Sequence, residues 1–126
     1  MRKGLTSTLE FVVTDKDTAE TLLSGDLPVL GTPRLVAWVE AATCAAIAES
    51  LPFGQTSVGT RIAIEHRAAS PVGAHVTVQA TLNHVDGRLL KFEVVATDSH
   101  TSVVLGHGEI TRVVVDRERF LARVTG

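Results

Sequence analysis

The stretch RLVAWVEAATCAAIAE, from Arg34 to Glu49, decides how this chain folds. Nearly every residue between its two charged ends is apolar or small, so no polar stripe marks one side of the predicted helix as solvent-facing. A helix that is apolar all round is normally buried. We therefore expect a central helix here, and its single internal charge, Glu40, stands among apolar neighbours.

Glu40 is the first candidate for a catalytic group. Burying an unpaired carboxylate is costly, and such a group in general responds by favouring its neutral form. A sheltered carboxylate can serve as an acid, a base or a nucleophile. On composition alone, a structural carboxylate that reaches solvent at a subunit seam or caps a neighbouring loop is an equally good interpretation.

Residues at both ends set the bounds of the helix. Thr32 is a good N-cap residue, and Pro33 stands at the first helical position, where proline is best tolerated. Ser50-Leu51-Pro52 and then Gly54 predict its end. Ahead of it, the pattern predicts a strand over 6–13 and a short helical turn over 18–23.

After Gly54 the pattern becomes extended. It predicts strands over 56–67, 75–85, 89–98 and 103–115, and a charged tail over 116–124 that can form a short helix. Short turns such as Asp86-Gly87 join them, which predicts antiparallel pairing. The fold class is therefore α+β, with an antiparallel five-stranded sheet wrapped around the helix. A second subunit is the natural cover for whatever one sheet leaves exposed.

Length and composition place the chain among ordinary globular proteins. Its 126 residues suit one domain, 1–126, with 44% hydrophobic and 21% charged residues. A net charge of −2 gives no argument for a nucleic-acid partner or a membrane surface. The single cysteine, Cys44, and the missing signal-peptide core favour a cytoplasmic protein.

His66 is the expected partner of Glu40. It shares a strand face with Ile62 and Ile64, and β-branched residues on one face should point to the core. Glu40 and His66 then both project into the interface between helix and sheet, a recurrent acid–base arrangement. Gly59, further back on the strand, marks either a close approach to a ligand or a bulge.

Several segments together resemble a known family. They are GTPRLVAWVEAA at 31–42, SVGT at 57–60, EHRAASPVG at 65–73, DGR at 86–88 and GHGEITR at 106–112. With these residues the chain resembles the fluoroacetyl-coenzyme A thioesterase-like group of hot-dog-fold proteins. The resemblance implies a hot-dog fold, usually a dimer with its active site at the subunit interface, and hydrolysis of acyl-CoA thioesters.

The same resemblance implies roles for particular residues. Thr32, Glu40 and His66 occupy the catalytic positions, Gly59 the backbone position near the thioester carbonyl, and Arg112 a position near the substrate. From residue chemistry, four cations are candidates for the phosphates of coenzyme A, because guanidinium groups in particular match phosphate oxygens: Arg61, Arg67, Lys91 and Arg112.

Helix geometry limits how these residues can meet. If Pro33 begins the helix, Thr32 lies about 12 Å from Glu40 along the axis. Either the helix begins after Pro33, or two subunits share the site, or Thr32 touches the substrate. A phenylalanine-bearing lid ahead of the helix is associated with fluoroacetyl selectivity in this family. The segment Leu22–Leu30 has no aromatic residue, so we expect a short-chain or aryl acyl group instead.

Other functions remain as alternatives. A non-catalytic module could bind acyl-CoA or another small ligand in the same cleft, and a hydratase of the same fold ranks lowest because no Asp–His pair lies near the helix start. His107 and Glu109 fall short of a metal signature, so we expect no metal and no cofactor. The expected assembly is a homodimer or a dimer of dimers.

Overall fold

The computed structural model describes residues 1–125. Its elements are β1 (Thr6–Val12), a 3₁₀ turn (Asp15–Asp17), α1 (Ala19–Leu22), α2 (Thr32–Ile47), a 3₁₀ turn (Ala48–Ser50), β2 (Gln55–His66), β3 (His75–Asp86), β4 (Leu89–Asp98), β5 (Val104–Asp116) and α3 (Arg117–Thr125). Each strand that the sequence predicts is present, with ends that differ by at most one residue. The charged tail forms α3.

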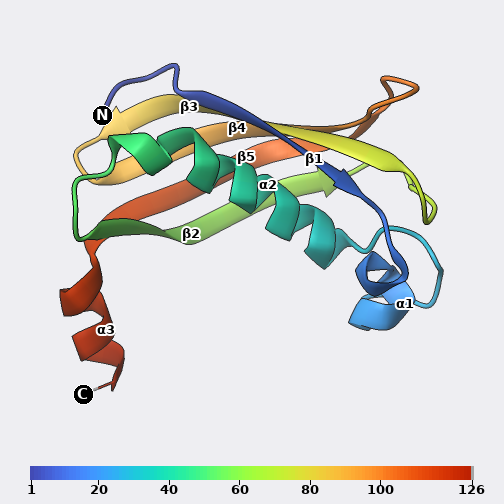
Figure 1. The fold of residues 1–126 in the computed structure, drawn as a ribbon, viewed down its shortest axis with the longest axis horizontal. Coiled ribbons are helices and arrows are strands. Elements are labelled where there is room, and N and C mark those ends of the chain that lie inside the picture. Colours follow the sequence, from blue (N-terminus) through green and yellow to red (C-terminus); the bar gives the residue numbers. More distant parts are fainter. Residues whose placement is uncertain (126) are drawn as a thin grey trace.

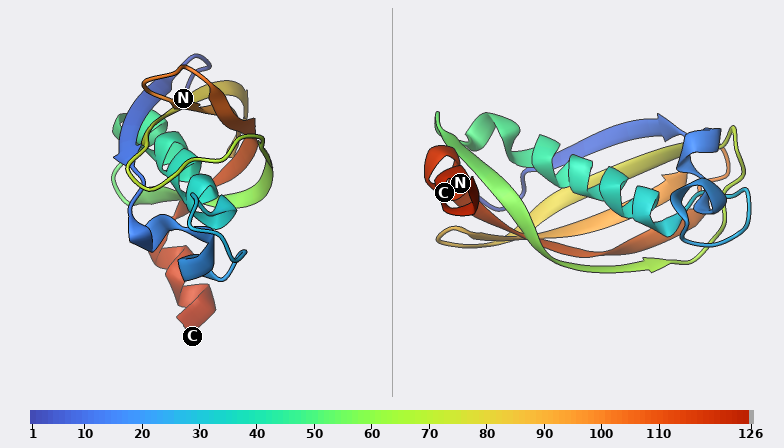
Figure 2. Two further views of the ribbon diagram at one scale, coloured as in Figure 1. Left: turned by 90° about the vertical axis from the view of Figure 1, so that its right-hand side faces the viewer. Right: turned by 90° about the horizontal axis from the view of Figure 1, so that it is seen from below.

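One antiparallel sheet carries the fold, and α2 lies across one of its faces (Figure 1). The strand order is β1-β3-β4-β5-β2, so β1 and β2 form the two edges. The sheet curves around the helix, as the view along the molecule in Figure 2 shows. The predicted α+β architecture, a five-stranded sheet wrapped around a long helix, is confirmed.

The pairing of β2 differs from the prediction. Consecutive short turns led us to expect each strand beside the next, but β2 pairs with β5 and β3 pairs with β1. The link over 67–74 is therefore a crossover to the other half of the sheet and not a hairpin. Gly106 and Gly108 bring β5 close to β2, since a Cβ atom at either position would collide with the β2 backbone.

The core lies between the inner face of α2 and the sheet. Leu35, Val39 and Ala42 of α2 are at most 2% exposed. They belong to one apolar cluster with residues of β3, β4 and β5: Val76, Val78, Ala80, Leu82, Leu90, Phe92, Val94, Ala96, Leu105 and Ile110. Trp38 stacks on Phe11 of β1 with ring centroids 4.6 Å apart. Each large aliphatic or aromatic side chain buried in this way contributes about 1.5–3 kcal/mol.

The outer face of α2 is not covered by the sheet of its own chain, the case in which we expected a second subunit to supply the cover. Ala37, Ala41, Cys44 and Ala45 are exposed to solvent in the single chain. A five-stranded sheet of this curvature covers only one side of the helix. The outer face consists of small side chains, so within one chain the apolar composition of α2 does not correspond to burial around its whole circumference.

The start of α2 also differs from the prediction. Gly31 is the N-cap and Thr32 is the first helical residue, with Pro33 in the first turn. Gly31 is fully packed, because a Cβ atom there would lie 3.0 Å from Leu22 Cδ1 and 3.2 Å from the backbone of Ala19. The backbone of residue 31 therefore takes the cap position, and the Thr32 hydroxyl is free for another contact.

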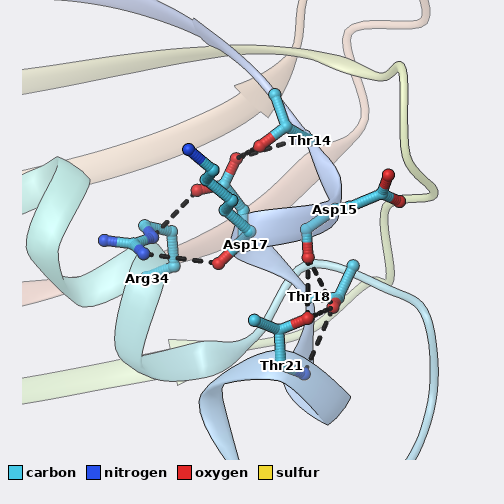
Figure 3. A network of polar contacts seen from close by, with 7 residues as sticks. Thr14, Asp15, Asp17, Thr18, Thr21 and Arg34 are labelled. Carbon is cyan, nitrogen blue, oxygen red and sulfur yellow. Dashed lines mark hydrogen bonds and ion pairs between the residues drawn. The ribbon is translucent and has the colours of Figure 1, made fainter.

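A polar network holds the segment before α2 against the helix start (Figure 3). Oδ1 of Asp17 lies 2.9 Å from Nε of Arg34, in the first turn of α2. The other carboxylate oxygen of Asp17 accepts from both the backbone N–H and the hydroxyl of Thr14, each at 2.8 Å. The Gly31 N–H donates to the Asp17 carbonyl at 2.8 Å. Asp17 thus ties β1 to α2.

The helix α3 projects from the end of β5 beyond the body of the sheet (Figure 1). It is the C-terminal helix of the described chain, and none of its residues is buried. Within residues 1–125, no helix is both long enough and apolar enough to cross a bilayer.

Candidate active site

The carboxylate of Glu40 pairs with a buried arginine. Nη1 of Arg112 lies 3.2 Å from Oε2 of Glu40, with side chains that are 8% and 31% exposed, respectively. Glu40 comes from the middle of α2 and Arg112 from β5, so the ion pair joins the helix to the sheet. Among residues 1–125, the hydrogen bonds of the Glu40 side chain all go through Oε2, and Oε1 is left without a protein donor.

Ser57 holds the other side of the same guanidinium. Nε of Arg112 donates to Oγ of Ser57 at 2.8 Å, and Nη2 donates to the Ser57 carbonyl at 3.0 Å. One residue therefore engages two of the three guanidinium nitrogens, and the third is directed at Glu40. Because the guanidinium is planar and rigid, the contacts with Ser57 also fix the direction in which Nη1 of Arg112 points toward Glu40.

Gly59 provides the space for this ion pair. It lies directly across from Arg112 in the β2–β5 register, and Ser57 lies two residues earlier on the same face of β2. A Cβ atom on Gly59 would lie 2.5 Å from Oε2 of Glu40 and 3.5 Å from Nη1 of Arg112. The register shifts between Gly59 and Arg61, so a bulge accompanies the glycine, as one of the two sequence interpretations predicted.

Thr32 and His66 form a second pair. Oγ1 of Thr32 lies 2.8 Å from Nδ1 of His66. The contact joins the first residue of α2 to the last residue of β2. It is available because Gly31 and not Thr32 caps the helix. Either the hydroxyl donates to Nδ1 or a protonated Nδ1 donates to the hydroxyl, depending on the imidazole tautomer.

The imidazole of His66 is partly sheltered from solvent. Burial lowers the pKa of His66 below its ordinary value, and the backbone of Ala68 offsets part of this change. The ring is therefore neutral at neutral pH. Its Nε2 atom is buried and has no hydrogen-bond partner among residues 1–125. Nε2 is thus a free donor or acceptor, as the tautomer decides.

The expected bond between Glu40 and His66 is not present within one chain. Glu40 binds Arg112, whereas His66 binds Thr32. The two pairs stand at α2 positions eight residues apart, which corresponds to about 12 Å along the helix. Because α2 already begins at Thr32, the possibility that the helix starts after Pro33 is also wrong.

The four cations predicted to bind the phosphates of coenzyme A differ in their exposure to solvent. Arg67 is exposed just after the end of β2, close in sequence to His66. Arg61 and Lys91 are exposed on the sheet. Arg112 is 6% exposed and bound to Glu40 and Ser57, so it is not a surface ligand for phosphate.

A separate depression lies away from Glu40 and His66. It has a volume of about 480 Å³ and is lined by side chains of the sheet face turned away from α2, including Thr81, Glu93 and His107. His107 pairs with Glu65 at 3.3 Å and not with Glu109. In the described part of the chain, no three His, Cys, Asp or Glu side chains cluster closely enough to hold a metal ion.

Sequence reasoning missed Ser57 and the role of Arg112 as the partner of Glu40. One signal was available in the sequence. Ser57 and Gly59 are two residues apart on a strand, so the serine hydroxyl and the space beside the glycine lie on the same face. The β2–β5 register, which places Arg112 across from Gly59, was not readable from the sequence, because the sequence predicted β3 as the neighbour of β2.

The arrangement has a definite chemical capacity. One carboxylate oxygen of Glu40 is anchored by a cation, the other accepts no hydrogen bond from residues 1–125, and the side chain is 31% exposed. Such a group can remove a proton from water or attack an electrophilic carbon. A neutral imidazole with a free nitrogen, oriented by a hydroxyl, can hold or move a second proton.

Comparisons with known proteins agree on one family. The family model described as fluoroacetyl-CoA-specific thioesterase, FlK, matches residues 13–118. The fluoroacetyl-CoA thioesterase of Streptantibioticus cattleyicolor is 37% identical over 130 residues, which cover 98% of this chain and 92% of that protein.

Solved structures give the same result. A structure of the fluoroacetyl-CoA thioesterase FlK superposes with a TM-score of 0.90 at 37% identity, covering 98% of this chain and 95% of that one. A Thermus thermophilus member of the thioesterase superfamily, 24% identical with a TM-score of 0.90 over 98% of this chain and 90% of its own, supports the fold alone. The hot-dog fold is confirmed, and the chain belongs to the fluoroacetyl-CoA-specific thioesterase family, as its sequence motifs led us to expect.

Proposed function

We propose that this protein hydrolyses a short-chain or aryl acyl-CoA thioester, with Glu40 as the general base or nucleophile. The observation that carries the proposal is the asymmetric environment of the Glu40 carboxylate. Arg112 holds Oε2, and Oε1 of this partly exposed side chain accepts no hydrogen bond from residues 1–125. A carboxylate held in this way is oriented before the substrate arrives, which reduces the entropic cost of the reaction.

Glu40 can act by either of two routes for thioester hydrolysis. In the general-base route, Oε1 of Glu40 takes a proton from water, the water oxygen bonds to the thioester carbon, and the carbon–sulfur bond breaks. In the nucleophilic route, Oε1 bonds to that carbon first and water then cleaves the resulting anhydride. In both, the thiolate of coenzyme A leaves and receives a proton. Backbone N–H groups near Gly59 and at the N-terminus of α2 are suited to stabilise the oxyanion that forms on the thioester carbonyl.

Thr32 and His66 belong to the same proposed site but come from a second subunit. Within one chain they lie about two helical turns from Glu40, too far for a shared contact with a small reacting group. The edge strand β2 carries Gly59 in its first half and His66 at its end. If β2 pairs antiparallel with its copy, the end of one strand meets the first half of the other. Thr32 and His66 of one subunit then approach Glu40 of its partner.

Exposed surfaces support a homodimer built in this way. The outer face of α2, with Ala37, Ala41 and Cys44, is uncovered. Ile62 in the middle of the β2 edge is 43% exposed. A free edge strand beside an apolar helix face is a natural pairing surface for a second copy. A dimer of dimers is compatible with the same surfaces.

The substrate proposal rests on relatives and on the segment before α2. Solved FlK structures include one with acetyl-CoA and one with fluoroacetate and coenzyme A. Arg67, exposed beside the end of β2, is suited to a phosphate group of coenzyme A. Leu22–Leu30 contains no aromatic residue, which favours an acyl group other than fluoroacetyl.

The direct test is a comparison of Glu40→Gln with the parent protein on a panel of short-chain and aryl acyl-CoA esters. Loss of a general base costs about 10²–10⁴-fold in kcat. Glu49→Gln, at an exposed carboxylate near the end of the same helical segment, is the matched control and should retain full activity. Equal rates for Glu40→Gln and the parent would contradict the proposal. Ligand-induced thermal stabilisation without turnover of any ester would favour the binding-module alternative.

A mixing experiment tests the shared site. Glu40→Gln and His66→Ala are each expected to be inactive. If each site takes Glu40 from one subunit and His66 from the other, every mixed dimer contains one intact site. Co-expression in equal amounts then restores about one quarter of the parent activity, because about half the dimers are mixed. No restoration would show that Glu40 and His66 act from the same chain.

A further inference from the structure

Ser57 makes two hydrogen bonds with Arg112, the residue that holds Glu40. Its hydroxyl accepts from Nε of Arg112 at 2.8 Å and its carbonyl accepts from Nη2 at 3.0 Å. A serine hydroxyl on a strand has several possible partners. The Ser57 hydroxyl binds Arg112, which in the described chain is the only arginine that contacts Glu40. The contact lies on the helix-facing side of β2, next to Gly59.

The guanidinium of Arg112 is held at all three nitrogens. Ser57 engages two of them and Glu40 the third. Because the guanidinium is planar and rigid, rotation about the last side-chain bonds would have to break the Ser57 contacts first. Gly59 has no side chain to press on the guanidinium: the position that a Cβ atom would take lies 3.5 Å from Nη1 of Arg112 and is occupied by Oε2 of Glu40.

We propose that Ser57 is a positioning residue for thioester hydrolysis: it fixes Arg112 so that Glu40 presents one oxygen, Oε1, to the reacting groups. This inference rests on the proposed function of Glu40. Without the Ser57 hydroxyl, the Arg112 fork keeps only the carbonyl contact and can rotate into a two-pronged grip on both oxygens of Glu40. Such a grip occupies the oxygen that the reaction needs.

A merely structural role would have different consequences. Ser57 lies near the start of β2, across from Val114 of β5, and its Arg112 contacts also join these two strands. If the contacts served only to stabilise the sheet, their loss would lower the melting temperature and leave kcat per folded molecule unchanged. The positioning role predicts a loss in kcat with little change in KM, because substrate binding does not use Ser57.

The test compares Ser57→Thr with Ser57→Val, two β-branched residues of nearly equal shape that differ in the hydroxyl. We expect kcat of Ser57→Val to fall about 10-fold, as for one lost hydrogen bond to a charged group, with KM within about 2-fold. Ser57→Thr should stay within about 3-fold of the parent, since it retains the acceptor. Equal kcat values for the two variants would overturn the proposal.

A double-mutant cycle shows whether Ser57 acts through Arg112. In an Arg112→Ala background, Ser57→Val should change kcat by less than about 2-fold, because the group it positions is absent. A full, additive loss in that background would overturn the proposed route.

A measurement without catalysis separates this inference from the proposed function. Carbon-13 NMR compares the signal of the Glu40 side-chain carboxyl at one neutral pH in the parent and both variants. We expect a changed chemical shift in Ser57→Val and a parent-like one in Ser57→Thr. An unchanged chemical shift in both would overturn the positioning role. If the parent hydrolyses no ester of the panel, the proposed function fails, and this chemical shift still decides whether Ser57 governs the Glu40–Arg112 contact.

Discussion

Gly59 and Glu40 share one small volume between β2 and α2. A Cβ atom on Gly59 would lie 2.5 Å from Oε2 of Glu40, closer than real Cβ atoms come to an oxygen. The backbone of Gly59 does not need glycine for its own conformation, since its φ is not in the left-handed region. The glycine therefore makes room for the Glu40 carboxylate, whereas the Arg112 guanidinium, 3.5 Å from the same position, is at ordinary contact distance.

The first prediction concerns Gly59→Ala. The added methyl group must displace the Glu40 carboxylate, so kcat/KM should fall by about 100-fold, as expected for a misplacement of roughly 1 Å. Displacing the carboxylate weakens its ion pair with Arg112, which should also cost about 1 kcal/mol of unfolding free energy. Activity assays and chemical denaturation measure the two effects.

The control for Gly59→Ala is the same substitution in a Glu40→Ala background. With the carboxylate removed, the methyl group has room, and most of the stability cost should disappear. If Gly59→Ala is equally destabilising in both backgrounds, the glycine serves the strand or its bulge and not the carboxylate.

The second prediction concerns the Thr32 hydroxyl. Thr32→Val keeps the shape and removes the contact to Nδ1 of His66, so kcat should fall about 10-fold. Unfolding free energy should change by less than about 0.5 kcal/mol, because Gly31 and not Thr32 caps α2. Thr32→Ser, which retains the hydroxyl, should keep most of the activity.

The opposite pattern for Thr32→Val would restore the capping interpretation. An N-cap threonine replaced by an apolar residue costs about 1 kcal/mol of stability. A loss of that size with unchanged kcat would assign Thr32 to the helix and remove it from the site. Steady-state kinetics and thermal unfolding on the same samples distinguish the two roles.

The sequence predicted elements better than it predicted their neighbours. Strand alternation and turn residues act locally, so β4 and the ends of the other strands were predicted to within one residue. The partner of β2 depends on a crossover whose direction no local pattern specifies. The exposure of Ala37 and Ala41 likewise depends on how far the sheet curves, and small apolar residues suit both a core and an uncovered face.

The candidate site shows the same division. Glu40 is conspicuous in the sequence because one charge stands in an apolar helix, and His66 because it ends a strand face of apolar residues. Their partners were not predicted, because Arg112 reaches Glu40 only through the β2–β5 register and Thr32 reaches His66 only once Gly31 takes the cap. Residue types indicated the chemistry, and the three-dimensional register assigned the pairs.

The third prediction uses the lowered pKa of His66. Burial disfavours the imidazolium, so the folded protein binds fewer protons at this site than the unfolded chain does. Stability is therefore lost as the pH falls below about 6.5, the ordinary value for histidine. Thermal unfolding between about pH 8 and pH 5 should show that His66→Gln gains stability relative to the parent as the pH decreases.

The control for this pH effect is His84→Gln. His84 is exposed on the sheet, so its replacement should leave the pH dependence of the parent in place. Parallel curves for the parent and His66→Gln over the whole range would contradict the burial of the His66 ring. Because His66 is only partly buried, the expected difference is modest, and solvent screening reduces it further.

The fourth prediction concerns the network ahead of α2. Asp17→Ala removes the ion pair with Arg34 and two hydrogen bonds from Thr14, so it should cost about 1–2 kcal/mol of unfolding free energy. Asp15→Ala, at an exposed neighbour whose carboxylate makes no such contacts, should change stability by less than about 0.5 kcal/mol. Equal effects in the two variants would show that the ion pair in Figure 3 contributes nothing specific.

The last prediction concerns the acyl group. FlK is described as specific for fluoroacetyl-CoA, and its solved structures include a variant in which a phenylalanine was replaced by alanine. In this chain Leu22–Leu30 has no aromatic residue, and Leu23 and Leu27 are 90% and 60% exposed. A hydrophobic site distinguishes ligands of similar size by only about 10–200-fold. We therefore expect kcat/KM for fluoroacetyl-CoA and acetyl-CoA to differ by less than about 100-fold, with longer or aryl acyl groups hydrolysed at least as well. A larger preference for fluoroacetyl-CoA would mean that selectivity in this family does not require an aromatic residue ahead of the central helix.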